Sequence, residues 1–324
     1  MIHAPVPGSR PVGTRGVPPV PHGQTALRLE WKFLPKEVRA LVEDELGSPV
    51  VASQSQNAGF TPGFASVLTG ADGSKAFVKA ASRVAQAEIA ASYAEEARKL
   101  VLLGDLVPTP RLDWFSKDES WVLLGFEAVQ CRAPRRPWRL DELDRALDLA
   151  EAIIEATDVL PDGLDLNPLY VDLPPLLTGW RDVPEAWPHR AEAAALAASL
   201  PDFAGNDHFV HADLRDDNIL LATDGRTLAC DWNWPALGPV WQDSVDLLVA
   251  AHGDGLEVEP VLAARRLTRD ADPEHIDAWL AATCGFMLSA RTRPTRATSP
   301  HLRTHTDWYA EAAWSWLARR RGWI

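Results

Sequence analysis

The stretch HADLRDDNILL, residues 211–221, is the densest group of polar residues between apolar segments of the sequence. The stretch CDW follows it at residues 230–232. Together they supply a carboxylate, a cation, an amide and a second carboxylate on neighbouring strand and loop elements. Phosphoryl transfer depends on positioning and on neutralising charge, and it needs groups of these kinds. The pattern therefore predicts a phosphoryl-transfer site.

The spacing of these residues resembles that of the aminoglycoside phosphotransferase and choline kinase superfamily, whose members are relatives of the protein kinases. Each residue alone would fit a polar turn with a buried histidine and solvated aspartates, and only the combined spacing favours a kinase-like site. The resemblance covers roughly residues 50–248 and implies an α+β, bilobal protein-kinase-like fold. The matching positions are His211, Asp213, Asn218, Asp231, Gly238, Pro239 and Asp243.

The resemblance also implies roles for individual residues. Asp213 would accept or orient the proton of the acceptor hydroxyl, and Arg215 would neutralise charge on the transferred phosphoryl group. Asn218 and Asp231 would hold Mg²⁺ against the nucleotide phosphates, since hard oxygen ligands suit this ion. The sequence departs from the commoner family pattern at Asn233, and this leaves open any metal or water contact made there. His211 and Asp243 are expected to brace the loops, not to touch substrate.

The first half of the chain carries residues that suit a nucleotide-binding lobe. Lys79 ends an apolar strand and is one of only six lysines among 32 basic residues. A compact ammonium group suits bridging phosphates. By the resemblance, this lysine pairs with a glutamate on the next helix, best matched by Glu96, with Glu95 as the one-residue alternative. Alternatively, Lys79 and Glu96 could each be an ordinary charged residue on the surface.

Two further segments fall where the family binds its nucleotide, ATP or GTP. Gly59 and Gly63 lie between two predicted strands, and glycines there let backbone N–H groups approach phosphate oxygens. The same glycines would also fit a simple hairpin. Residues Glu127 to Val129 fall at the expected hinge between the lobes, where the backbone groups of Glu127 and Val129 would bind the nucleobase.

The chain divides by composition into three parts. Residues 1–25 are rich in Pro and Gly and predict a disordered tail. Residues 26–130 predict an antiparallel sheet with one inserted helix, the nucleotide-binding lobe, and residues 131–324 predict a mainly helical lobe with the catalytic and acceptor-binding groups. Strands are predicted at 50–51, 54–61, 64–68, 75–79, 111–115 and 121–126, and shorter β pieces at 209–211, 219–221 and 227–231. Helices are predicted at 27–46, 83–103, 140–157, 185–199, 240–252, 273–290 and 304–321.

Composition excludes several classes of partner. The 32 basic and 45 acidic residues give a formal net charge of −13, which would repel a nucleic acid backbone. No apolar run approaches the roughly 18 residues that a membrane span needs. Three scattered cysteines form neither a disulfide framework nor a thiolate metal site, and the N-terminus lacks an apolar signal core. We therefore expect a cytoplasmic protein without nucleic acid or membrane partners, and its oligomeric state stays open.

The acceptor is a small molecule with a hydroxyl group if the resemblance holds. Residues 141–172 contain ten acidic residues and one base, Arg145. In the resembling fold this lobe supplies the acceptor pocket, so the acids would attract a cationic acceptor such as an aminoglycoside or an amino alcohol. A solvated helix face explains the same charges. Trp180 and Trp187 could form an aromatic wall for a cation, or belong to the core.

Three functions from different classes follow from these patterns. The first is a Mg²⁺-dependent phosphotransferase that moves the γ-phosphate of ATP or GTP to the acceptor hydroxyl. The second is a nucleotide-binding pseudokinase or regulatory module without turnover, and the joint presence of Lys79, Asp213, Asn218 and Asp231 argues against it. The third is a metal-dependent phosphoesterase, which would need more converging metal ligands than the histidine spacing offers.

Overall fold

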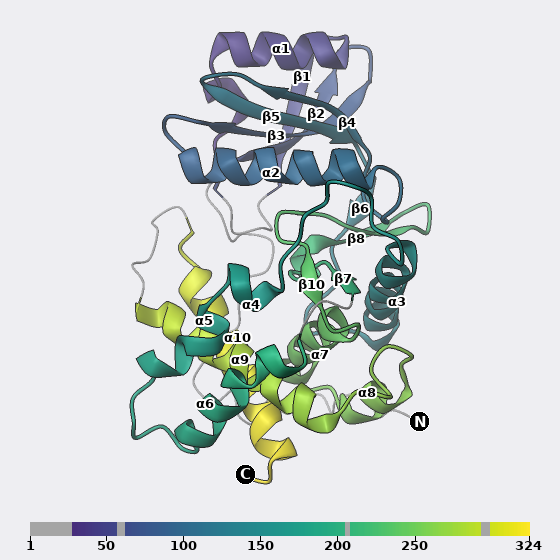
Figure 1. The fold of residues 1–324 in the computed structure, drawn as a ribbon. Coiled ribbons are helices and arrows are strands. Elements are labelled where there is room, and N and C mark those ends of the chain that lie inside the picture. Colours follow the sequence, from purple (N-terminus) through teal and green to yellow (C-terminus); the bar gives the residue numbers. More distant parts are fainter. Residues whose placement is uncertain (1–27, 57–61, 205–207, 293–298) are drawn as a thin grey trace.

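The chain folds into a sheet region and a helical region that lie one above the other (Figure 1). Gly59 and the predicted disordered tail, residues 1–25, lie outside the residues that the structure describes. The predicted lobe limits, 26–130 and 131–324, stay predictions. The computed structural model describes residues 28–56, 62–204, 208–292 and 299–324.

The sheet region holds five strands in the order β1-β2-β3-β5-β4, and every pairing between them is antiparallel. Gly73 forms the predicted turn between β2 and β3 with a φ of 90°, which glycine adopts without steric cost. The two strands predicted at 50–51 and 54–61 form one strand as far as Ser55. The strands are β1 (Val50–Ser55), β2 (Phe64–Gly70), β3 (Lys75–Ser82), β4 (Leu112–Lys117) and β5 (Trp121–Glu127).

Two helices cover the two faces of this sheet, α1 (Lys36–Leu46) and α2 (Ala87–Leu103) (Figure 1). Successive residues of a strand point to opposite faces. Leu123 therefore packs in the apolar cluster that contains α1, and its neighbour Leu124 packs in the cluster that contains α2. Because α2 lies between the sheet and the helical region, a charged residue on this helix can reach groups from both.

Two small antiparallel sheets lie directly below α2 and carry the polar loops of the helical region. In one, β7 (His208–Val210) pairs with β10 (Ala236–Gly238), and in the other, β8 (Ile219–Ala222) pairs with β6 (Cys131–Arg132) and β9 (Thr227–Ala229). The sequence predicts β7, β8 and β9 but not β6 and β10. The two missed strands have two and three residues, which is too short for a periodic pattern to show.

The helical region is built around α9, which packs against α10, α6 and α5. Trp180 lies in this core, where its indole N–H donates to the Ala281 carbonyl over 2.8 Å. A Cβ at Gly285 would lie 2.5 Å from the same ring, so this position requires glycine. The helices are α3 (Leu140–Ala156), α4 (Leu169–Asp172), α5 (Pro175–Thr178), α6 (Arg190–Ala198), α7 (Gln242–Gly253), α8 (Glu259–Ala264), α9 (Pro273–Ser289) and α10 (Leu302–Arg320).

The architecture is the predicted α+β arrangement of an antiparallel sheet with a helix inserted between β3 and β4, followed by a mainly helical region. Helix α6 begins five residues later than predicted, because Pro184 and Pro188 interrupt the preceding segment. Within the described ranges, no helix combines the length and the apolar character that crossing a bilayer demands.

Candidate active site

Lys79 on β3 lies at the centre of a buried charge cluster. Its ammonium contacts both carboxylate oxygens of Glu96 on α2, at 2.7 and 2.8 Å. The same ammonium contacts the carboxylate of Asp231, which is 152 residues away in the chain. The alternative, Glu95, points elsewhere and pairs with Arg98 at the surface of α2. The structure thus brings the predicted lysine, glutamate and aspartate together.

The charges in this cluster stabilise one another. Burial alone would lower the pKa of Lys79, but the carboxylates of Asp231 and Glu96 outweigh it and raise that pKa above its usual range. Burial would likewise raise the pKa of Asp231, and the neighbouring ammonium lowers it instead. At neutral pH, Lys79 is therefore cationic and Asp231 is anionic.

The loop from His211 to Asn218, here named the catalytic loop, follows β7 and is braced from two sides. The Asp243 carboxylate, at the start of α7, accepts the N–H groups of His211 (2.7 Å) and Ala212 (2.9 Å). The His211 ring lies 3.1 Å from the Cys230 carbonyl oxygen, and burial lowers its pKa to about 4. A neutral imidazole therefore joins this loop to the loop that carries Asp231.

Asp213 is held in place by the other polar residues of the catalytic loop. The Asn218 amide donates to the backbone carbonyl of Asp213 (2.8 Å) and to its Oδ2 (3.0 Å). Arg215 forms an ion pair with Asp213 at 2.9 Å and binds Asp217 with its Nε (3.0 Å) and Nη2 (3.1 Å). Burial raises the pKa of Asp213 to about 6, although Arg215 opposes this shift. A carboxylate that is ionised at neutral pH and titrates near it suits a general base.

Asn218 and Asp231, the predicted metal ligands, lie on two loops joined by a 3.0 Å hydrogen bond from the Cys230 N–H to the Asn218 carbonyl. Because the Asn218 NH₂ group donates to Asp213, its Oδ1 faces away from that residue and accepts no hydrogen bond from the described residues. Among these residues no three His, Cys, Asp or Glu side chains converge as a metal site. One amide oxygen and one carboxylate fit Mg²⁺, which keeps water and phosphate oxygens as its other ligands.

The other predicted nucleotide-binding residues have additional partners. A Cβ at Gly63 would lie 2.5 Å from the hydroxyl of Tyr93 on α2, so packing alone requires glycine there. The N–H of Glu127 donates to the Arg111 carbonyl (2.9 Å), and its carboxylate pairs with Arg226 (3.0 Å). Val129 follows β5 as a half-buried residue. Binding of nucleotide by these residues stays a prediction, and Gly59 lies outside the described residues.

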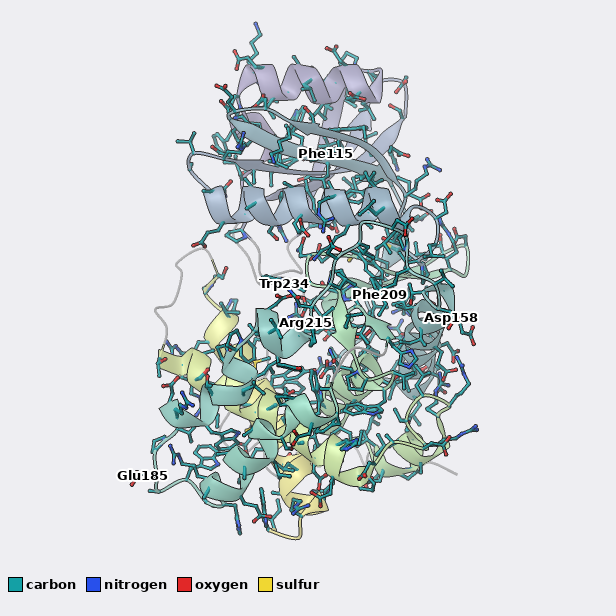
Figure 2. All side chains as sticks on the ribbon, in the orientation of Figure 1. Phe115, Asp158, Glu185, Phe209, Arg215 and Trp234 are labelled. Carbon is teal, nitrogen blue, oxygen red and sulfur yellow. The ribbon has the colours of Figure 1, made fainter. Side chains whose placement is uncertain are left out.

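The sequence did not reveal how the loop after Asp231 is anchored. The ammonium of Lys99 on α2 donates to the Asn233 carbonyl over 2.9 Å. The next residue, Trp234, is 54% exposed. The structure describes all fourteen tryptophans, and the other thirteen are buried or half-buried. In Figure 2, Trp234 and Arg215 lie in the middle of the molecule, whereas Asp158 and Glu185 lie at its outer edges.

Most of the acidic segment lies away from this site. Five of the six carboxylates of α3 form ion pairs with arginines that lie outside the segment, among them Glu142 with Arg132 and Glu151 with Arg265. The end of the segment differs. The Asn167 carbonyl accepts the Leu237 N–H, and the Asn167 amide donates to Asp172, both over 2.9 Å. The segment around Asp172 is therefore the acidic part that adjoins the loop after Asp231.

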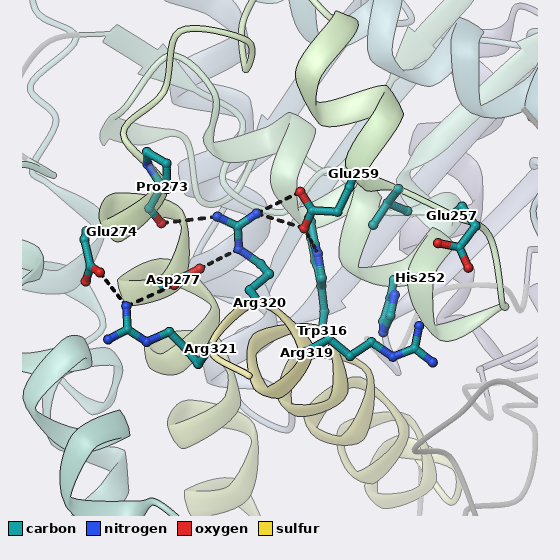
Figure 3. Close-up of a pocket in the computed structure, with 11 residues that line it drawn as sticks. His252, Glu257, Glu259, Pro273, Glu274, Asp277, Trp316, Arg319, Arg320 and Arg321 are labelled. Carbon is teal, nitrogen blue, oxygen red and sulfur yellow. Dashed lines mark hydrogen bonds and ion pairs between the residues drawn. The ribbon is translucent and has the colours of Figure 1, made fainter. Parts of the chain in front are cut away.

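A separate cavity of 490 Å³ lies at the end of α10 (Figure 3). We name its three consecutive arginines, Arg319, Arg320 and Arg321, the C-terminal arginine cluster. Arg320 binds Glu259 and Asp277 there. The residues lining this cavity include none of the predicted site residues.

The model of the phosphotransferase enzyme family matches residues 60–284, more than two thirds of the chain. The chain belongs to the phosphotransferase enzyme family. The match includes the Lys79 cluster, the catalytic loop and the loop with Asp231. It confirms the predicted family and the predicted class of enzyme, a small-molecule kinase.

Solved structures of this family's enzymes have the same fold. An aminoglycoside phosphotransferase from Alicyclobacillus acidocaldarius is 14% identical and covers 90% of this chain and 96% of its own, with a TM-score of 0.54. The aminoglycoside phosphotransferase APH(4)-Ia is 14% identical over 87% and 98%, with a TM-score of 0.58. Choline kinase LicA from Streptococcus pneumoniae is 12% identical over 86% and 100%, with a TM-score of 0.57. No protein of curated function matches the sequence. These similarities confirm the predicted fold class.

Proposed function

We propose that this phosphotransferase moves the γ-phosphate of ATP or GTP to a hydroxyl group of a small molecule. The observation that carries the proposal is the joint placement of two groups of residues. Lys79, Glu96 and Asp231 form one buried cluster, and Asp213 and Asn218 form a hydrogen-bonded pair on the adjoining loop. Two proteins of the same fold support nucleotide use, since APH(4)-Ia has been solved with ADP and hygromycin B, and LicA with AMP.

The nucleotide phosphates would bind beside the Lys79 ammonium, which Glu96 fixes in position. Asn218 Oδ1 and the Asp231 carboxylate would hold Mg²⁺, which neutralises charge on the phosphates when bound. Since Lys79 already contacts Asp231, the ammonium and the carboxylate are in place before ligands bind. The entropy cost of ordering these two side chains on nucleotide binding is therefore small.

Asp213 would accept the proton of the acceptor hydroxyl while that oxygen attacks the γ-phosphorus and the nucleoside diphosphate leaves. The contacts of its carboxylate with Asn218 and Arg215, which fix the orientation of the side chain, support this role. Arg215 would also offset the negative charge of the transferred phosphoryl group.

A cationic acceptor is the substrate class that we propose. The argument rests on the end of the acidic segment near Asp172 and on the exposed indole of Trp234, because a carboxylate and an aromatic face both attract cations. The argument does not use the carboxylates of α3, because five of the six pair with arginines.

Nucleotide turnover against a panel of aminoglycosides, amino alcohols and sugars tests the proposal. We expect release of nucleoside diphosphate that requires both Mg²⁺ and one class of acceptor, and that disappears in Asp213→Asn. Nucleotide binding without turnover on any acceptor would instead support the regulatory module. Hydrolysis of a phosphoester without nucleotide would support the phosphoesterase.

A further inference from the structure

Helix α7 holds the start of the catalytic loop. At its first turn, Asp243 accepts the backbone N–H groups of His211 and Ala212. Ala212 has a φ of 62°, a left-handed conformation that costs energy in any residue except glycine. The two hydrogen bonds offset that cost and define where the loop leaves β7.

The far end of the loop is also tied to α7, through a residue from a different part of the chain. Arg136 precedes α3, and its Nη1 donates to Asp216 of the catalytic loop over 2.8 Å. Its Nε and Nη2 donate to the two carboxylate oxygens of Asp254, over 2.5 and 3.0 Å. Asp254 is the residue directly after α7. The Arg136 guanidinium therefore links the catalytic loop to the C-terminal end of α7. The N-terminal end of the same helix already binds the loop through Asp243.

This link is buried and its geometry is restricted. The side chain of Arg136 is 5% exposed, that of Asp216 is 12% exposed and that of Asp254 is 10% exposed. The guanidinium lies 4.7 Å from the ring centroid of Trp308 on α10. A guanidinium is planar and presents its donors at fixed angles, so a fork between two carboxylates sets their relative position. Buried ion pairs add little net stability, and fixing one conformation is a better-supported role for them.

Asp216 stands next to the residues that orient the proposed base. Asp217 binds Arg215, Arg215 contacts Asp213, and Asn218 donates to Asp213. A shift of the loop at Asp216 would displace these partners together. Misplacement of a reacting group by about 1 Å can cost on the order of 100-fold in rate.

We propose that Arg136 is a positioning residue, which fixes the catalytic loop against α7 by bridging Asp216 and Asp254. The inference rests on the proposed function for its effect on turnover. It does not require Arg136 to touch nucleotide or acceptor.

The C-terminal arginine cluster offers a matched control. Arg320 is also largely buried, at 11% exposed, and it also bridges two carboxylates, those of Glu259 and Asp277 (Figure 3). It differs from Arg136 in having no contact with the catalytic loop. If Arg136 were only a structural residue, Arg136→Met and Arg320→Met would have the same effects.

The test compares these two variants with Asp216→Asn. We expect Arg136→Met and Asp216→Asn each to lower kcat by about 10- to 100-fold with the nucleotide KM within about threefold. The double variant should be no slower than the slower single variant, because both changes break one link. Arg320→Met should leave kcat unchanged. Arg136→Lys should recover little of the rate, because an ammonium keeps the charge without the fork.

Hydrogen exchange at the amides of residues 212–218 gives a readout that does not depend on activity. Exchange there should be at least about tenfold faster in Arg136→Met and unchanged in Arg320→Met. Equal exchange in both variants, or full activity of Arg136→Lys, would overturn the inference. If the unmodified enzyme turns over no nucleotide, the proposed function fails. The hydrogen-exchange data still decide whether Arg136 fixes the catalytic loop against α7. If Arg136→Met does not fold, Arg136→Lys and Asp216→Asn carry the comparison.

Discussion

The candidate active site, hereafter the active site, and the C-terminal arginine cluster both contain paired charges, but they are assembled differently. In the active site, Lys79 of strand β3 meets Asp231, which lies on a loop 152 residues away and has a left-handed φ of 64°. In the C-terminal arginine cluster, Arg320 at the end of one regular helix and Arg321 directly after it meet carboxylates of neighbouring helices. A charge of the active site thus depends on a constrained backbone conformation, whereas the charges of the C-terminal arginine cluster lie at the end of a regular helix.

The two groups of charges therefore differ in what a substitution should change. Burial raises the pKa of Asp213 to about 6, and its contacts with Arg215 and Asn218 orient the carboxylate without cancelling that rise. A charge change at Asp213 should therefore alter the rate far more than the stability. A change in the C-terminal arginine cluster should do the reverse.

The largest expected effect is that of Asp213→Asn on turnover. The amide keeps the shape of the side chain but accepts no proton, so kcat should fall by about 100- to 10,000-fold. Thermal unfolding should change little, since the burial cost of the charge is removed with it. The measurement is nucleotide turnover with the best acceptor of the panel, and a rate close to that of the unmodified enzyme would rule out Asp213 as the base.

Lys79→Met should combine a rate effect with a stability effect. It removes the ammonium proposed to bind phosphates, so kcat/KM for nucleotide should fall by about 100-fold. It also leaves the buried carboxylates of Glu96 and Asp231 without a cation, which should lower the free energy of unfolding by about 3 kcal/mol. Lys75→Met, an exposed position on the same strand, is the control and should alter neither quantity. A normal nucleotide KM in Lys79→Met would contradict the assignment.

Asp277→Asn tests the other side of the comparison. Asp277 is buried on α9 and binds Arg320 and Arg321. Loss of its charge should lower the free energy of unfolding by about 1 to 3 kcal/mol, measured by denaturant titration, and leave kcat within about twofold of its original value. A large loss of turnover in a folded variant would show that the two charge groups are coupled.

The smallest effect expected concerns pH and His252, which lines the same cavity. Its ring nitrogen lies 2.9 Å from Ser315 Oγ, and burial, assisted by Arg319, lowers its pKa to about 4. The unfolded chain binds this proton near pH 6.5, so stability from His252 is complete above that pH and is lost as pH falls toward 4. Between pH 6.5 and 5.5 the loss should be about 1 kcal/mol. Denaturant titrations of His252→Asn should show a shallower pH dependence by that amount, and identical slopes would contradict the shift.

The sequence predicted the parts of the fold and site that local pattern encodes. The Asp72-Gly73 turn, the long helices and the spacing of Asp213, Asn218 and Asp231 are all readable within short windows of the chain. The resemblance also predicted Glu96 as the best match for the partner of Lys79, with Glu95 as the alternative, and the structure pairs Lys79 with Glu96. Two assignments had weaker local signals. Packing against Tyr93 already explains the glycine at position 63, and five of the ten carboxylates of the acidic segment are held in ion pairs.

By itself, the sequence determined most of the longer helices and strands, which follow from periodicity and turn chemistry over a few residues. The residue spacing carried the family resemblance, and that resemblance implied the fold class and the types of group that converge on one site. Only the tertiary structure decided which distant side chains meet. Arg136 reaches Asp254 across 118 residues, and Lys99 reaches the Asn233 carbonyl across 134. Such contacts depend on how whole elements pack, and a charged side chain carries no local mark of the partner that will neutralise it.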